Sequence, residues 1–190
     1  TAGLPYKFRV YARNNVGYSP ASVTTEIYCG TVPYAMGLEP RVSSVTLNTN
    51  DADITVEWDP LDSTLNGGSP VTGYYIQINS GYGTGFNTPG EEIVLPATLS
   101  HTFTGLTKGV TYKFRVAAYN EIYTINPLGS ELKFSPAISA IAAIAPAQVP
   151  SLIQDESKLK SGTVTLKWTE PNDNGSPILY YKLYKDNGVG

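Results

Sequence analysis

The chain has 190 residues, of which 41% are hydrophobic, and this length accommodates one or two domains with packed cores. A net charge of −3 at pH 7 excludes a basic surface for nucleic acid or anionic lipid, and the longest apolar stretch, residues 137–147, is too short to cross a membrane. One cysteine and one histidine exclude a disulfide framework and a multi-cysteine metal site, and we expect neither a metal nor a cofactor.

Several short motifs occur twice in the chain. Tyr-Lys-Phe-Arg-Val occupies residues 6–10 and again residues 112–116. Ile-Thr-Val-Glu-Trp at 54–58 is echoed by Val-Thr-Leu-Lys-Trp at 164–168. The two pairs begin 106 and 110 residues apart, which is the length of a small domain. This spacing predicts a tandem array of domains, since short solenoid repeats have periods of about 20–50 residues.

Apolar and polar residues alternate within these motifs. Ile54, Val56 and Trp58 alternate with polar residues, and the next apolar segment, 71–79, follows a Gly-Gly-Ser-Pro turn. In 112–118 the aromatic and aliphatic residues share one face, while the cations take the other. A period of two predicts half-buried antiparallel strands. No segment has convincing helical spacing.

The motifs resemble those of the fibronectin type III family. The strand ending in Trp58, the Gly-Ser-Pro turn and the following Val-x-x-Tyr-x-Ile resemble its B and C strands, and residues 104–120 resemble its E–F corner and F strand. Leu106 and Tyr112 match the family's corner leucine and tyrosine-corner residue, whose hydroxyl bonds to nearby backbone. The resemblance implies an all-β fold of tandem immunoglobulin-like antiparallel β-sandwiches, one complete and two partial. The complete one has strands near 40–46, 52–58, 71–79, 85–94, 100–104, 110–119 and 134–143.

The offset between the copies predicts three domain segments. Residues 1–32 correspond to strands F and G of a first domain, 33–145 to a complete domain, and 146–190 to strands A to C of a third. Neither partial domain can bury a sandwich core by itself. Either the chain is a piece of a longer array, or neighbouring copies complete the partial domains by strand exchange. Proline in both linkers favours extended connections, so we expect a rod.

Four residues are expected to form the structural core. Trp58, Leu106 and Tyr112 should pack inside the complete sandwich, and Trp168 is the counterpart of Trp58 in the third segment. If the partial domains are not completed, Trp168 and the apolar residues of 6–10 face water.

Candidate catalytic and metal-binding residues are few. His101 is expected at the edge of the core, and Cys29 is expected to be semi-buried at a strand end. Residues 171–177, Pro-Asn-Asp-Asn-Gly-Ser-Pro, carry a row of oxygen ligands, but their place in the B–C turn favours turn geometry over calcium binding. Asn174 begins an N-glycosylation sequon whose following proline disfavours its use. We predict no catalytic residue and no enzyme.

The connection between strands F and G is longer in the middle domain than in the first. Ten extra residues fall within 120–134, a segment with too many apolar groups for a solvated loop. The sequence predicts a protein-binding loop here, because loops on rigid scaffolds commonly carry recognition. The alternative is that the loop folds over its own sheet or the neighbouring linker. The residues predicted to make the contacts are Ile122, Tyr123, Ile125 and Leu128.

These features predict a non-enzymatic structural and adhesive repeat protein that makes protein–protein contacts within an extended or fibrous filament. Its expected partners are other proteins, including further copies of the same chain, and not nucleic acid. An extracellular or cell-surface location is favoured over a cytoplasmic or ciliary one. Two alternatives stay open. The domains could be spacers within a larger carbohydrate-active enzyme, or an intracellular titin-like or ciliary scaffold, which the free Cys29 and the scarcity of sequons favour.

Overall fold

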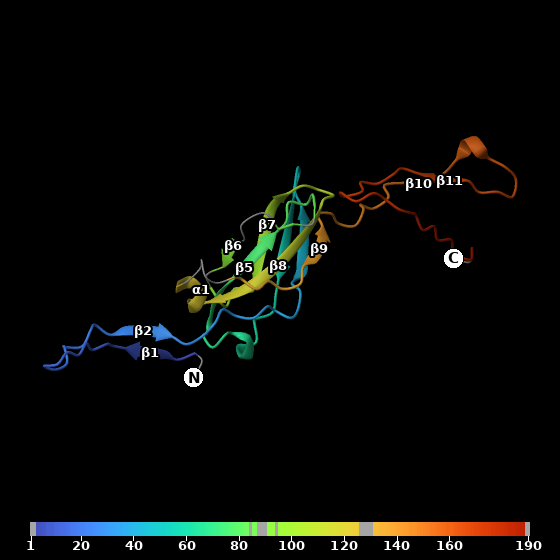
Figure 1. The fold of residues 1–190 in the computed structure, drawn as a ribbon. Coiled ribbons are helices and arrows are strands. Elements are labelled where there is room, and N and C mark those ends of the chain that lie inside the picture. Colours follow the sequence, from blue (N-terminus) through green and yellow to red (C-terminus); the bar gives the residue numbers. More distant parts are fainter. Residues whose placement is uncertain (1–2, 84, 87–90, 94, 126–130, 189–190) are drawn as a thin grey trace.

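The structure is a computed structural model that describes residues 3–83, 85–86, 91–93, 95–125 and 131–188. Figure 1 shows a central β-sandwich with one two-stranded hairpin extending from each end. Among the described residues, no helix combines the length and the apolar character needed to span a bilayer.

The central sandwich consists of two antiparallel sheets. One sheet has the strand order β3 (Arg41–Leu47), β4 (Ala52–Glu57) and β7 (Ser100–Leu106). The other has the order β6 (Glu91–Ile93), β5 (Val71–Ile78), β8 (Thr111–Asn120) and β9 (Ile138–Ile141). The expected all-β, immunoglobulin-like architecture is therefore confirmed. These strands lie where the sequence predicts them, although β6 and β9 are shorter than expected.

The core lies between the two sheets and follows the alternation in the sequence. On β4, every second residue is buried, and Trp58 continues this face with an exposed fraction of 2%. Its ring meets that of Tyr74 on β5, with centroids 5.7 Å apart. Phe103 on β7 and Phe114 on β8 make the corresponding contact further along the sandwich, at 5.2 Å. Contacts from both sheets thus fix how they pack face to face.

The corner between β7 and β8 is held by a tyrosine. The backbone N–H of Thr107 donates to the hydroxyl oxygen of Tyr112, 2.9 Å away, and the Tyr112 ring is buried. Leu106 ends β7 and is partly buried against the core. Opposite the Tyr112 ring, Gly81 has φ +80°, and a Cβ there would lie 2.9 Å from Cε1 of Tyr112. The tyrosine therefore depends on a residue without a side chain at position 81.

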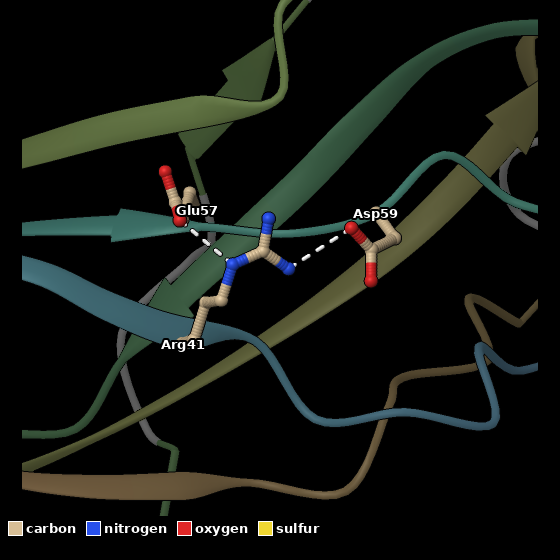
Figure 2. Close-up of polar contacts among 3 residues, drawn as sticks. All are labelled: Arg41, Glu57 and Asp59. Carbon is tan, nitrogen blue, oxygen red and sulfur yellow. Dashed lines mark hydrogen bonds and ion pairs between the residues drawn. The ribbon is translucent and has the colours of Figure 1, made fainter.

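An exposed ion-pair cluster joins the edge strand β3 to β4 (Figure 2). The guanidinium of Arg41 donates from Nε to Glu57, 2.7 Å away, and from a terminal nitrogen to Asp59, 2.9 Å away. Its hydrogen bonds to Asp59 and Glu57 hold the pKa of Arg41 above its usual range. Arg41 and Glu57 are direct partners in the strand register, so the cluster reinforces a pairing already made by the backbone.

The hairpins at the two ends have no second sheet facing them within the described residues. β1 (Pro5–Phe8) pairs with β2 (Thr25–Tyr28), and β10 (Leu152–Gln154) pairs with β11 (Leu166–Trp168). Phe8 is 54% exposed and Trp168 is 39% exposed, with its ring 5.3 Å from that of Tyr181. The apolar side chains that the middle sandwich buries at equivalent positions are thus largely exposed here.

Three short helical turns are present among the described residues, although no segment has convincing helical spacing. α1 (Glu121–Ile125) directly follows β8, and two short 3-10 turns, η1 (Ser63–Leu65) and η2 (Glu156–Lys158), lie in loops. Side-chain capping explains these turns better than periodicity does. Asp62 and Asp155 accept hydrogen bonds from the backbone N–H groups of Thr64 and Ser157. One turn of helix is too short for apolar spacing to reveal it.

Candidate protein-binding segment

The segment predicted to bind protein begins where β8 ends. We call residues 120–134 the F–G segment; α1 forms its first part, and residues 131–134 lead toward β9. In Figure 1, α1 lies at the end of the sandwich from which the β1–β2 hairpin extends. The first part of the F–G segment therefore lies at the end of the sandwich that the preceding chain enters.

Asn120 anchors this segment. It is fully buried, and its amide nitrogen donates to the backbone carbonyls of Thr31, 2.9 Å away, and Asn66, 2.8 Å away. Its side-chain oxygen accepts from the N–H of Tyr123 at 3.3 Å, as a helix N-cap does. Thr31 in turn donates its N–H to the carbonyl of Gly67 at 2.9 Å. One side chain thus ties together the preceding linker, the β4–β5 turn and α1.

The first residues of α1 face the preceding hairpin. A Cβ placed on Gly30 would lie 3.5 Å from Cγ1 of Ile122, so this side chain lies over the backbone that follows β2. The charge of Glu121 raises the pKa of Tyr28, and burial and the charge of Glu26 raise it further. Apolar and polar groups of α1 thus both meet the end of β2.

Tyr123 points the other way, onto the outer face of its own sheet. Its ring lies 6.0 Å from that of Tyr75 and 6.1 Å from that of Tyr119, which are themselves 5.5 Å apart. By strand alternation Tyr119 faces outward, yet only 3% of it is exposed. The F–G segment therefore gives part of this sheet a second, smaller apolar layer.

Arg115 continues the outer layer. Its guanidinium lies 4.2 Å from the ring centroid of Phe86 and 4.2 Å from that of Phe134, and its Nε donates to Gln77 at 2.8 Å. Burial lowers the pKa of Arg115. Because Phe134 belongs to the F–G segment, this stacking holds the far end of the segment against β8.

The structure thus separates the residues that the sequence grouped together. Ile122 lies against the preceding linker, and Tyr123 packs on its own sheet. Ile125 ends α1, but its side chain is outside the described part of the chain, as is the whole of Leu128. Sequence analysis missed Asn120 and Glu121. A signal for Asn120 was present, because the first copy of the repeat has Asn14 at the same place.

The other candidates make local contacts. His101 packs its ring 4.6 Å from that of Phe103, at the edge of the core. Cys29 follows β2 as expected but is exposed, so the expectation of a semi-buried thiol is wrong, because no second sheet covers the described hairpin. In the 171–177 turn, the side-chain oxygens of Asn172 and Asp173 accept backbone N–H groups two residues ahead. The turn chemistry accounts for both oxygens.

Comparisons with known proteins agree with this architecture. Residues 39–132 match the family model of the fibronectin type III domain. Among solved structures, a crystal structure of domains from titin superimposes with a TM-score of 0.50 at 21% identity, over 70% of this chain and 39% of that one. This likeness agrees with the immunoglobulin-like fold.

Three curated proteins illustrate the sequence similarity. The chain is 30% identical over 158 residues to a Kelch domain-containing protein of Saccharolobus solfataricus, which covers 78% of this chain and 18% of that protein. It is 36% identical over 121 residues to titin of Drosophila melanogaster, a match that covers 62% of this chain and 1% of that protein. It is 27% identical over 184 residues to the cell adhesion molecule-related/down-regulated by oncogenes protein of Xenopus laevis. This match covers 96% of this chain and 14% of that protein. The chain spans less than a fifth of each relative.

Proposed function

We propose that this chain is a non-enzymatic structural array of tandem fibronectin type III domains, in which the F–G segment holds consecutive domains together. In this proposal the β1–β2 hairpin is part of a first domain, residues 33–145 form a second, and residues 146–190 belong to a third. The role is mechanical: each domain sets the position of the next, and the exposed faces remain free for protein partners.

The observation that carries this proposal is the pair of hydrogen bonds from the buried Asn120 amide. They join a carbonyl of the preceding linker, at Thr31, to a carbonyl of the sandwich, at Asn66. A buried amide that lost one of these acceptors would be left unsatisfied, at a cost of about 1–3 kcal/mol. The contact therefore favours one arrangement of linker and sandwich over a flexible tether.

The relatives support a structural or adhesive role. One of them is named for cell adhesion, and the match to this relative extends over 96% of the chain, well beyond the single domain match. Extracellular adhesion is thus a more specific form of the proposal. It requires a protein partner on the exposed faces, and self-association is the simplest case.

The proposal is tested by hydrogen exchange and small-angle scattering on the full chain. Asn120→Asp removes both amide N–H donors and places a carboxylate among carbonyls. The Thr31 N–H should therefore exchange faster, and scattering should show that the chain adopts a wider range of maximum dimensions. The matched control is Asn14→Asp. Asn14 is the exposed counterpart of Asn120, and its side chain only accepts hydrogen bonds in the structure, from Val16 and Gly17. Equal exchange at Thr31 in the wild-type and Asn120→Asp chains would contradict the proposal.

A further inference from the structure

The sandwich meets the hairpins at its two ends through the same set of backbone contacts. At one end Gly3, which precedes the first Tyr-Lys-Phe-Arg-Val motif, lies against Gly68 of the Gly-Ser-Pro turn. At the other end Gly109, which precedes the second copy, lies against Gly175 of the next Gly-Ser-Pro turn. The paired residues are repeats of one another in the sequence.

The contact is close enough to exclude a side chain. A Cβ on Gly109 would lie 2.8 Å from the carbonyl oxygen of Gly175, and a Cβ on Gly3 would overlap the carbonyl of Gly68. All four glycines have positive φ, +83° and +77° at the corners and +86° and +89° at the turns. At the two corners glycine is therefore required for the close approach as well as for the backbone conformation. A Cβ on Gly175 would lie 3.3 Å from the carbonyl oxygen of Ala142, so the positive φ is the stronger requirement there.

The hydrogen bonds around the glycines repeat as well. Each corner glycine donates its N–H to the linker, Gly3 to Cys29 at 2.6 Å and Gly109 to Ala142 at 3.0 Å. Two residues further on, each linker donates an N–H to the following turn, from Thr31 to Gly67 at 2.9 Å and from Ile144 to Asn174 at 3.3 Å. Three elements thus meet in the same way at both ends.

We propose that the corner glycine, the linker and the turn glycine form one repeated joint, which docks the E–F corner of each fibronectin domain onto the B–C turn of the next domain in a fixed orientation. The partner of each corner surface is the next domain of the same array. Because the second joint forms without the F–G segment of the middle domain, the joint is separate from the Asn120 contact. It gives the array a constant angle between neighbours, and hence a regular superhelix.

The second joint also assigns a role to Asn174. It has φ +52°, the only positive φ of a non-glycine residue among those described, and its amide nitrogen donates to the carbonyl of Ala145 at 2.7 Å. Asparagine tolerates this conformation better than most residues, and the hydrogen bond to the linker holds it there. At the first joint Gly67 takes this position, with φ +74°.

The test is a distance measurement between spin labels in the full chain. Cys29→Ser removes the native thiol, and Ser44→Cys on the sandwich with Ser161→Cys on the C-terminal hairpin provides two exposed labelling sites. We expect one narrow distance. Gly109→Ala should abolish the narrow peak, whereas Gly105→Ala should keep it, because Gly105 has a similar φ of +70° but a Cβ there meets nothing within 4 Å. Both changes should lower the melting temperature, since both strain the same corner.

A second pair of variants covers the case in which Gly109→Ala fails to fold. Gly175→Ala lies outside the sandwich, and its Cβ would lie 3.3 Å from the carbonyl oxygen of Ala142. It should broaden the label distance while leaving the sandwich's melting temperature unchanged. Gly162→Ala, with φ +73° and no neighbour within 4 Å, is its control. A broad distance in the reference chain, or equal broadening by both members of a pair, would overturn the joint. The joint rests on the proposed tandem array, and the two can fail separately. An extended scattering profile together with a broad label distance would refute the joint and leave the array standing.

Discussion

The hydroxyl of Tyr112 on β8 accepts a hydrogen bond from the backbone N–H of Thr107, 2.9 Å away, at the corner where the chain crosses between sheets. The ring of Tyr112 is buried, while its oxygen satisfies a backbone donor in the turn between β7 and β8. This single contact couples the core to the corner that carries Gly109.

Tyr112→Phe should destabilise the sandwich by about 1–2 kcal/mol, because it keeps the ring but leaves the Thr107 N–H without this partner. Chemical denaturation of the full chain measures the change. Tyr82→Phe is the control, since Tyr82 is 75% exposed and should change stability little. A Tyr112→Phe chain as stable as the control would mean that water replaces the hydroxyl at no cost.

Trp58→Ala should cost about 3–5 kcal/mol, because the indole is buried and contacts Tyr74 across the core. Trp58→Phe should cost less than half as much. The indole Nε1 is the only fully buried side-chain nitrogen or oxygen of the described residues without a hydrogen-bond partner, so replacing it also removes an unsatisfied donor. Both values come from urea melts of the full chain. A Trp58→Phe cost equal to that of Trp58→Ala would contradict this, because the ring that phenylalanine retains would then contribute nothing to the core.

The contrast between Trp58 and Trp168 shows what sequence analysis can determine. Both end a strand with the same alternation, and both were predicted as core residues, yet one is 2% exposed and the other 39%. Period-two patterning identifies which face of a strand is apolar, but it does not tell whether a second sheet covers that face. The strands were predictable for this reason, whereas the tyrosine corner was predicted from the resemblance to the fibronectin type III family.

The F–G segment was predictable only in part. Its length and apolar content indicated a contact, but the division between Ile122 and Tyr123 depends on one turn of helix. That turn begins because Asn120 caps it while bonding to Thr31, a residue distant in the sequence. Local pattern carries no record of such a long-range contact. The glycine joints could not be predicted either. A glycine in a turn is usually explained by its positive φ, so the sequence does not reveal that another backbone approaches it closely.

Glu121→Gln should lower the pKa of Tyr28 toward its usual value, because Glu121 is the largest cause of the raised pKa. The sign for stability follows from linkage. The folded state holds the Tyr28 proton more tightly than the unfolded state, so this contribution is present below pH about 10 and is lost as pH rises through the folded-state pKa. NMR of labelled tyrosine ring carbons measures the pKa directly, and Glu131→Gln serves as the control. An unchanged Tyr28 pKa in Glu121→Gln would place the two side chains apart in solution.

Ile122→Ala and Tyr123→Ala should affect different properties, although the residues are neighbours on α1. Tyr123 packs against Tyr75 and Tyr119 of its own sheet, so its loss should reduce the stability of the sandwich by about 1–3 kcal/mol, given about 0.5–1.5 kcal/mol for each aromatic pair. Ile122 lies over Gly30 in the preceding linker, so its loss should leave the melting temperature nearly unchanged and speed hydrogen exchange at Thr31. Thermal melts and exchange measurements on both variants separate the two effects. If Ile122→Ala destabilises the sandwich as much as Tyr123→Ala and leaves exchange at Thr31 unaltered, then α1 serves its own domain only. In that case the Asn120 amide alone connects the F–G segment to the preceding chain.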